Sequence, residues 1–332
     1  MKIYVTMPPS EQTDTFLTPK ALKRLRELGE VFLNTNERQL TTDEVTEWAK
    51  DADVLVTCWG TCKYSKADVA KMPNLKLIAH TGGTVVPVAA PDLYETNVQV
   101  ISGNNVFAKS VAEGALCYTL DALRRIEFYL NEVREGRWRQ AEFQNRGLIG
   151  KTVGIIGFGT IAKHFVELIR WFDCEVLIYS SHLTQEEAAK YGARTAGLEE
   201  IFSTCDVISV HAANTPKNHG MVSRKLIESM KQDALIVNTA RGPVIDEEAM
   251  FEHIMSGHIC GALDVFCEEP LPVDHPMRQC KNALLLPHMG GPTIDMRENV
   301  TLDLCKEIER LKNGLPLQSA YSADAATRMT PG

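Results

Sequence analysis

Short runs of β-branched and other apolar residues alternate with longer helix-compatible stretches along most of this 332-residue chain. In the first hundred residues the runs are KIYVTM, EVFLN, ADVLVTC, LKLIAHT and VQVISG. A second series follows with KTVGIIGF, EVLIYS, DVISVHA, ALIVNT, GALDVF and NALLLPH. Strands that alternate with helices form parallel sheets joined by right-handed crossovers. The sequence therefore predicts an α/β protein with two doubly wound, parallel-sheet domains.

The two series are separated by a long helix-compatible segment, NNVFAKSVAEGALCYTLDALRRIEFYLNEVREGRW, which we expect to link the domains. A final helix over about 293–313 would cross back to the first domain. The first domain would then comprise residues 1–103 and 293–332, and residues 104–292 would form the second. A chain of this length exceeds what a single hydrophobic core usually supports. The polar tail SADAATRMTPG is expected to be loosely ordered.

Composition excludes several classes of partner. The formal net charge is −8 without a run of Lys and Arg, which argues against nucleic acid and against an anionic membrane surface. No apolar stretch approaches the roughly 18 residues of a membrane span, and the start MKIYVTMPPSEQ does not resemble a signal peptide. Nine scattered cysteines predict free thiols and a cytoplasmic protein without a metal site.

A glycine-rich turn follows the first strand of the second series. Gly157, Gly159 and Ala162 fit the pattern G-x-G-x-x-[G/A]. The first glycine permits a tight turn, the second lets the backbone approach a pyrophosphate, and the small third residue lets the helix pack closely. The helix N-terminus then offers N–H groups to phosphates. Because the motif lies between an apolar strand and a helix, it predicts a dinucleotide site rather than a purely structural turn.

The next strand, EVLIYS, lacks the acid that usually binds the ribose hydroxyls of NAD. Ser180 stands at this position and is followed by Ser181 and His182. An acid there repels the 2′-phosphate of NADP, whereas hydroxyls and an imidazole can hydrogen-bond to it. The pattern thus favours NADP over NAD. The alternative is that the three residues only form a loop and that NAD binds without the acid, since no arginine follows immediately.

Three polar residues follow strands of the second series: Arg241, Glu269 and His288. In an open parallel sheet, ligands bind beyond the carboxyl ends of the strands. Arg241 would grip a substrate carboxylate with two hydrogen bonds and polarise the neighbouring carbonyl. His288 would donate a proton as hydride arrives, and Glu269 would raise the pKa of His288. Each residue alone is more often part of a surface ion pair, but their joint placement beside a nucleotide motif indicates reduction of a carbonyl next to an anionic group.

Two further strand residues carry polar groups. Asp264 lies inside the strand GALDVF, where a buried acid needs a partner, and the carboxamide of a nicotinamide would be a suitable one. His211 ends the strand DVISVH and either borders the cofactor or has a structural role.

Several motifs together resemble the D-2-hydroxyacid dehydrogenase family: GIIGFGTIA, NTARGPVIDEEAM, GALDVFCEEPLP and LLLPHMGG, in this order, with LKLIAHTGG and NNVFAKSVAEGAL before them. The resemblance implies that Arg241, Glu269 and His288 form the catalytic set. It also implies a Rossmann nucleotide-binding domain inserted in a flavodoxin-like substrate domain, and a homodimer.

The resemblance implies binding residues as well. Thr160 and Ile161 would touch the pyrophosphate. Gly82 and Gly83 would present backbone N–H groups to the substrate carboxylate, and His80 would either add a hydrogen bond or be a mere loop residue. Further cofactor contacts are expected at Ala213, Thr239, Ala240, Asp264 and Gly290.

This chain departs from the family pattern at five of its positions: His80, Thr84, Val86, Ser180 and Ala213. Three of them cluster in the substrate loop, so the particular 2-oxo acid cannot be carried over from a relative. We expect a cytoplasmic NAD(P)-dependent reductase that converts a small 2-oxo acid to its D-2-hydroxy acid. The alternatives are a nucleotide-sensing scaffold or corepressor with little turnover, and a dehydrogenase of an unusual anion.

Overall fold

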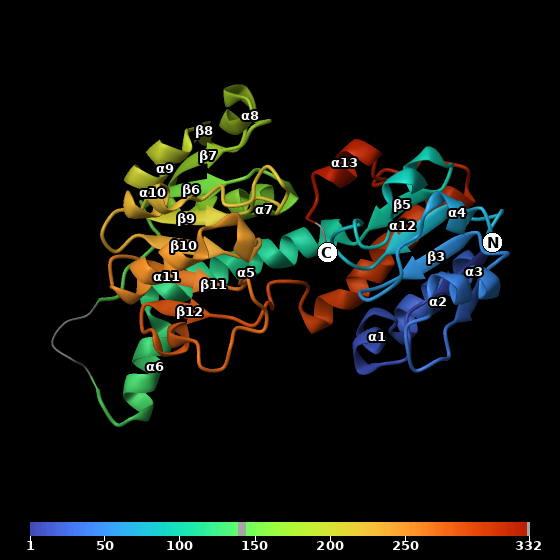
Figure 1. The fold of residues 1–332 in the computed structure, drawn as a ribbon, viewed down its shortest axis with the longest axis horizontal. Coiled ribbons are helices and arrows are strands. Elements are labelled where there is room, and N and C mark those ends of the chain that lie inside the picture. Colours follow the sequence, from blue (N-terminus) through green and yellow to red (C-terminus); the bar gives the residue numbers. More distant parts are fainter. Residues whose placement is uncertain (139–143, 331–332) are drawn as a thin grey trace. The chain divides into compact units, whose positions relative to one another are not determined.

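The computed structural model describes residues 1–138 and 144–330. The chain forms two compact units, Met1–Phe107 with Pro292–Gly332, and Ala108–Gly291. Each unit is built on its own parallel β-sheet with helices on both faces (Figure 1). The predicted doubly wound α/β architecture is therefore confirmed. The assignment of one unit to the substrate and the other to the nucleotide stays a prediction.

The first unit contains five parallel strands in the order β2-β1-β3-β4-β5, a flavodoxin-like arrangement. The strands are β1 (Lys2–Val5), β2 (Glu30–Leu33), β3 (Val54–Thr57), β4 (Leu77–His80) and β5 (Gln99–Ser102). The helices are α1 (Glu11–Phe16), α2 (Pro19–Leu28), α3 (Thr42–Trp48), α4 (Lys66–Val69), η1 (Pro91–Glu95), η5 (Ile294–Met296), α12 (Arg297–Lys312) and α13 (Ala323–Thr327).

Alternate residues of these strands contribute to two hydrophobic cores, one on each face of the sheet. Ile3 and Val5 of β1 pack with the apolar faces of α2 and α12 on one side of the sheet. Tyr4 packs on the other side with residues of α3 and α4. Successive side chains of a strand point to opposite faces, so both faces of this sheet are covered and its strands read as continuous apolar runs.

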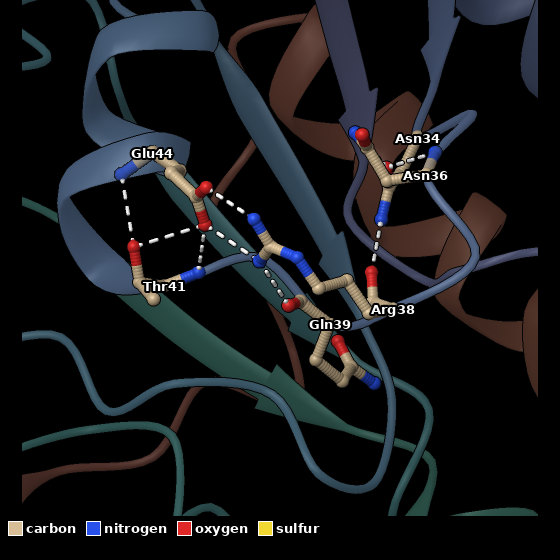
Figure 2. Close-up of polar contacts among 6 residues, drawn as sticks. All are labelled: Asn34, Asn36, Arg38, Gln39, Thr41 and Glu44. Carbon is tan, nitrogen blue, oxygen red and sulfur yellow. Dashed lines mark hydrogen bonds and ion pairs between the residues drawn. The ribbon is translucent and has the colours of Figure 1, made fainter.

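Figure 2 shows how the chain turns from β2 into α3. The hydroxyl of Thr41 accepts the N–H of Glu44, and the Glu44 carboxylate accepts the N–H of Thr41 at 2.8 Å, a reciprocal capping box. The guanidinium of Arg38 pairs with the same carboxylate, and these contacts lower the pKa of Glu44 to about 2. Asn34 accepts the N–H of Asn36 at 2.9 Å. Side-chain hydrogen bonds therefore define this loop.

The second unit contains seven parallel strands in the order β12-β11-β10-β9-β6-β7-β8. The chain winds outward from β6 through β7 and β8, then returns to pair β9 with the other side of β6. Such a reversal of strand order creates the crevice in which nucleotides bind. The strands are β6 (Thr152–Ile156), β7 (Glu175–Tyr179), β8 (Ala193–Thr195), β9 (Val207–Val210), β10 (Leu235–Asn238), β11 (Cys260–Leu263) and β12 (Ala283–Leu285).

Helices cover both faces of this second sheet. One core joins the sheet to α5 and α7, and the other joins it to α9, α10 and α11. The helices and short helical turns are α5 (Asn104–Arg124), α6 (Ile126–Arg134), α7 (Thr160–Ile169), η2 (Arg170–Phe172), α8 (Gln185–Ala189), α9 (Leu198–Thr204), α10 (Arg224–Glu228), η3 (Gly242–Val244), α11 (Glu247–Met255) and η4 (Pro276–Gln279).

The structure differs from the sequence-based expectations in three places. The strand β8 was not expected, because its three residues form no apolar run. The long segment between the two series is broken at Arg125, whose φ of 54° lies in the left-handed region. The prediction of a loosely ordered tail is wrong for residues 322–330, which contain α13 and bury Ala326, while the last two tail residues lie outside the described part of the chain.

Among residues 1–138 and 144–330, no helix combines the length and the apolar character that crossing a membrane requires.

Candidate active site

The three polar residues singled out by the sequence lie at one edge of the second sheet. Arg241 follows β10, Glu269 follows β11 and His288 follows β12. These strands are parallel neighbours, since β11 pairs with both β10 and β12. The carboxyl ends of neighbouring parallel strands meet at the same edge, so the sheet itself brings the three residues together.

Glu269 and His288 form a direct pair. Oε2 of Glu269 lies 2.6 Å from Nδ1 of His288, and Oε1 accepts the N–H of Phe266 at 2.9 Å. The backbone thus orients the carboxylate, which in turn orients the imidazole. Nε2 of His288 has no hydrogen-bond partner among the described residues, and 43% of the side chain is exposed. This nitrogen is therefore the one that can exchange a proton with a ligand.

The carboxylate of Asp264 binds the backbone of the two residues that follow His288. Asp264 is 1% exposed, and its two carboxylate oxygens accept the N–H groups of Met289 and Gly290 at 2.8 and 2.7 Å. Burial raises the pKa of Asp264, while the two N–H groups oppose that rise. A Cβ at residue 290 would lie 2.7 Å from the carboxylate, so this position requires glycine. The sequence-based expectation of a nicotinamide partner for Asp264 stays a prediction; the structure provides backbone partners for both oxygens.

Arg241 is partly buried and forms no ion pair with a carboxylate among the described residues. Nη1 donates to the carbonyl of Ala240 at 2.6 Å. Burial lowers the pKa of Arg241, and the charges of Glu269 and Asp264 oppose this effect. A largely desolvated guanidinium without an acidic partner is suited to bind the carboxylate of a ligand.

Asn238, which the sequence analysis passed over, shapes the turn that carries Arg241. It is fully buried, its amide donates to the carbonyl of Arg241 at 3.1 Å, and its side-chain oxygen accepts the N–H of Ala240 at 3.0 Å. The only sequence signal was an asparagine at a strand end, a residue type that often hydrogen-bonds to nearby backbone.

The glycine-rich turn has the geometry of a phosphate cradle. Gly157 has a φ of +89°, and a Cβ there would lie 2.8 Å from the backbone of Ala212, so only glycine fits. At Gly159 no atom lies within 4 Å of the Cβ position, which leaves open space at the N-terminus of α7. Ala162 is fully buried, whereas Thr160 is exposed and Ile161 partly buried in the first turn. These residues fit the pyrophosphate of a dinucleotide.

Ser180 follows β7 directly, beside this turn, because the N–H of Gly157 donates to the carbonyl of Tyr179 at 2.8 Å. Ser180 Oγ accepts the N–H of His182 at 3.5 Å, and the side chains of Ser181 and His182 are exposed. The strand end therefore presents hydroxyl and imidazole groups and no acid.

The remaining expected cofactor residues lie at the same edge of the sheet. Thr239 is buried, and its hydroxyl has no hydrogen-bond partner among the residues that the structure describes, as expected of a group that binds a ligand. Ala213 and Ala240 are partly buried in the loops after β9 and β10. His211 contacts Ser209 Oγ through Nε2 at 2.9 Å, and burial lowers its pKa to about 4, which favours a structural role.

In the first unit, the Gly82–Gly83 turn follows β4. The carbonyl of Gly82 accepts the N–H of Gly103 at 3.0 Å, and the carbonyl of Gly83 accepts the hydroxyl of Ser102 at 3.0 Å. Neither glycine N–H donates to an acceptor in the part of the chain that is described. Two such N–H groups in one turn are suited to bind an anion.

His80 lies beneath this turn. It is 2% exposed, and Nδ1 lies 2.9 Å from the hydroxyl of Thr57. Burial lowers the pKa of His80 to about 4. A Cβ at residue 82 would lie 2.2 Å from Nε2 of His80, so the ring occupies the space that a side chain at Gly82 would need. The imidazole thus supports the turn from inside, and a direct contact with substrate stays a prediction.

Within residues 1–138 and 144–330, no cluster of three or more His, Cys, Asp or Glu side chains could hold a metal ion.

Comparison with known proteins decides the family. Residues 116–290, more than half of the chain, match the family model described as "D-isomer specific 2-hydroxyacid dehydrogenase, NAD binding domain". The chain belongs to the D-isomer specific 2-hydroxyacid dehydrogenase family. This D-2-hydroxyacid dehydrogenase homologue is 31% identical to a formate dehydrogenase of Neurospora crassa over 88% of its own length and 82% of the relative's.

Other relatives differ from it in length. A D-3-phosphoglycerate dehydrogenase of Methanocaldococcus jannaschii is 33% identical over 95% of this chain, but the match covers only 58% of that protein. The chain spans about half the length of the D-3-phosphoglycerate dehydrogenases that it matches. The fold is also that of a phosphoglycerate oxidoreductase from Rhizobium etli, with a TM-score of 0.82 and 23% identity over 97% of this chain and 98% of the other.

Proposed function

We propose that this protein is an NAD(P)-dependent oxidoreductase that reduces a small 2-oxo acid to the D-2-hydroxy acid. The observation that carries the proposal is the Glu269–His288 pair at 2.6 Å, at the same sheet edge as Arg241, which has no acidic partner among the described residues. Membership of the D-isomer specific 2-hydroxyacid dehydrogenase family supports this reaction class.

In the proposed reaction each residue has a separate role. Arg241 binds the carboxylate and polarises the adjacent carbonyl. When bound, the reduced nicotinamide supplies the hydride that the carbonyl carbon accepts. His288 transfers a proton from Nε2 to the carbonyl oxygen, so that a hydroxyl group forms. Glu269 stabilises the positive charge of the imidazolium and fixes the orientation of the ring.

Within the first unit, the Gly82–Gly83 turn is proposed to bind a carboxylate. Support comes from its N–H groups, which have no acceptor in the described part of the chain, while its carbonyls are both engaged. Backbone N–H groups of this kind bind anions without a charged side chain.

For the cofactor, we propose that NADPH is preferred to NADH. Ser180 and the exposed Ser181 and His182 leave the strand end without the negative charge that would repel a 2′-phosphate. Arg194 of the neighbouring strand is not available for that phosphate, because it pairs with Glu175 and Glu200. The preference therefore rests on hydroxyl and imidazole groups, and we expect it to be modest.

A homodimer is proposed from the surface of α6. Ile126, Leu130 and Val133 follow one another at helical spacing and are 54%, 45% and 52% exposed. The helix buries none of its residues within the described chain. An exposed apolar stripe of this kind is typical of a subunit contact. Leu130→Glu with Val133→Glu should give a monomer in analytical ultracentrifugation; an unchanged mass would contradict this contact.

The cytoplasm is the proposed location, because all nine cysteines are free. Proteins of oxidising compartments more often pair their thiols.

One assay matrix tests the proposed function. Purified protein is given NADH or NADPH with glyoxylate, hydroxypyruvate, pyruvate and bulkier 2-oxo acids, and cofactor oxidation is followed. We expect turnover with at least one acid, and its loss in Arg241→Ala and His288→Ala. Full activity in either variant would contradict the assignment. Tight binding of cofactor without turnover would instead favour a nucleotide-sensing scaffold.

A second candidate is the oxidation of an unusual anion. The 31% identity to a formate dehydrogenase supports it. The same protein is therefore also assayed with formate and NAD⁺ or NADP⁺, and formate oxidation without reduction of any 2-oxo acid would favour this alternative.

A further inference from the structure

The end of the chain lies against the turn that we propose to bind the substrate carboxylate. Residues 321–330, here called the C-terminal strap, begin at the edge strand β5, where the N–H of Tyr321 donates to the carbonyl of Val100 at 2.9 Å. Ala326 is buried, and Tyr321 and Met329 pack against the same core. The strap is therefore an ordered part of the first unit.

Two side-chain contacts connect the C-terminal strap to the turn. The hydroxyl of Thr84 donates to the carbonyl of Thr330 at 2.9 Å. The hydroxyl of Tyr321 lies 3.2 Å from that of Ser102, which also donates to the carbonyl of Gly83 at 3.0 Å. The strap thus contacts the turn directly at Thr84, and indirectly at Gly83 through a chain of two hydroxyls.

The hydrogen bonds of the Gly82 and Gly83 carbonyls determine the direction of the N–H groups that follow them, and Tyr321 of the strap contacts one of the two donors, Ser102. In a trans peptide the C=O and the following N–H point in opposite directions. Because the Gly82 carbonyl is bound to Gly103 and the Gly83 carbonyl to Ser102, the N–H groups of Gly83 and Thr84 point away from both partners. Neither N–H has an acceptor in the described chain. Any rotation of these two peptides would redirect the N–H groups.

We propose that the C-terminal strap is a positioning element that fixes the peptides of residues 82–84 for binding the substrate carboxylate. The inference rests on the proposed function of the Gly82–Gly83 turn. It assigns Tyr321 and Thr84 as positioning residues, which act through the backbone and do not touch the substrate. Binding of substrate is expected to depend on them more than the chemical step does.

The test compares Thr84→Val, Tyr321→Phe and their double variant with the parent protein. Each single substitution removes one hydroxyl and retains the shape of the side chain, and the double variant removes both hydroxyls. Thr327→Val is the matched control, because the Thr327 hydroxyl lies on the same strap but donates to Asp324 at 2.8 Å instead of the turn. Thr84→Ser keeps the hydroxyl and should restore the parent behaviour.

We expect the double variant to raise the KM of the 2-oxo acid about tenfold, with kcat and the KM of the cofactor within about twofold of the parent. Thr327→Val and Thr84→Ser should leave all three constants unchanged. An unchanged substrate KM in the double variant would overturn the proposal. So would a loss of thermal stability that lowers kcat without affecting that KM, since the strap would then be a structural element only.

A second readout does not depend on activity. The N–H of Gly103 is hydrogen-bonded to the carbonyls of His80 and Gly82, so its hydrogen exchange reports how firmly the turn is held. Exchange should be several-fold faster in the double variant than in the parent and in Thr327→Val. If the protein reduces no 2-oxo acid but exchange responds in this way, the proposed function fails and the positioning role stands. Unchanged exchange overturns the positioning role.

Discussion

Oε2 of Glu269 lies 2.6 Å from Nδ1 of His288, and the second oxygen of the same carboxylate accepts the backbone N–H of Phe266. The contact joins loops that follow two neighbouring strands, β11 and β12. The carboxylate of Glu269 thus binds Nδ1 of His288 and leaves Nε2 for a ligand, while the N–H of Phe266 fixes the carboxylate.

Glu269→Gln tests the charge of the pair. Glutamine retains the size and can still contact Nδ1, but it provides no negative charge to stabilise an imidazolium. We expect kcat for 2-oxo acid reduction to fall about 100-fold, within the usual range for loss of acid–base assistance. Cofactor affinity, measured by fluorescence titration, should not change. Glu268→Gln changes the adjacent acid and serves as control. Parent kcat in Glu269→Gln would show that the charge is not needed.

Arg241→Lys tests whether the guanidinium of Arg241 binds the substrate carboxylate through two parallel hydrogen bonds. The positive charge is retained, but an ammonium group cannot form two parallel hydrogen bonds with a carboxylate. The KM of the 2-oxo acid should rise by about two orders of magnitude, which is roughly 3 kcal/mol of binding. Steady-state kinetics with saturating cofactor measure this effect. A lysine variant with the parent KM would mean that Arg241 does not contact the carboxylate in this way.

Asp264→Asn should affect both stability and catalysis. Asparagine keeps one acceptor oxygen, but its NH2 group cannot accept a hydrogen bond, so the N–H of either Met289 or Gly290 loses its acceptor. Leaving such a buried group unpaired costs about 1–3 kcal/mol of unfolding free energy, and displacement of the adjacent His288 should lower kcat. Urea unfolding measures the stability. Asp274→Asn, at an exposed position, is the control. Equal stability of the two variants would contradict the role of Asp264.

The strand ends that carry these residues could be located from sequence because each strand is a short apolar run bounded by polar residues. Arg241, Glu269 and His288 were found from the rule that ligands bind beyond the carboxyl ends of parallel strands. The partners of Asp264 were not predictable, since Met289 and Gly290 lie 25 and 26 residues away and contribute only backbone.

In the first unit, too, some contacts could not be predicted from the sequence. The burial of His80, whose Nδ1 contacts the hydroxyl of Thr57, and the docking of the tail both depend on long-range contacts without a local pattern. The polar composition of the tail predicts a loose segment, yet Ala326 is buried and Met329 packs against the same core.

The stability of the first unit should depend on pH through His80. A histidine in the unfolded chain titrates near 6.5, whereas burial lowers the pKa of His80 to about 4 in the folded protein. Between these values the unfolded chain binds more protons, so the unfolding free energy decreases as the pH falls from about 6.5 to 4. A shift of this size corresponds to roughly 3 kcal/mol.

Urea unfolding at a series of pH values, with His80→Asn beside the parent, measures this contribution. The pH dependence should be smaller in His80→Asn, and it should be unchanged in His219→Asn, where the histidine is exposed. Identical pH dependence in the parent and in His80→Asn would mean that His80 does not stay neutral in the folded chain.

Ser180→Asp should reverse the cofactor preference. The new carboxylate would bind the ribose hydroxyls of NADH and repel the 2′-phosphate of NADPH. We expect kcat/KM for NADPH to fall at least tenfold, while kcat/KM for NADH is retained or rises, which makes NADH the internal control. If the parent protein already rejects NADPH in favour of NADH, the interpretation of Ser180 is wrong.

We propose that His288, held by Glu269, gives a proton to the carbonyl of a 2-oxo acid. The most direct measurement is single-turnover oxidation of bound NADPH by the best 2-oxo acid of the assay matrix, in the parent and in His288→Ala. We expect rapid oxidation in the parent and a rate at least about 100-fold lower in His288→Ala, with cofactor binding intact. Equal rates in the two proteins would contradict it.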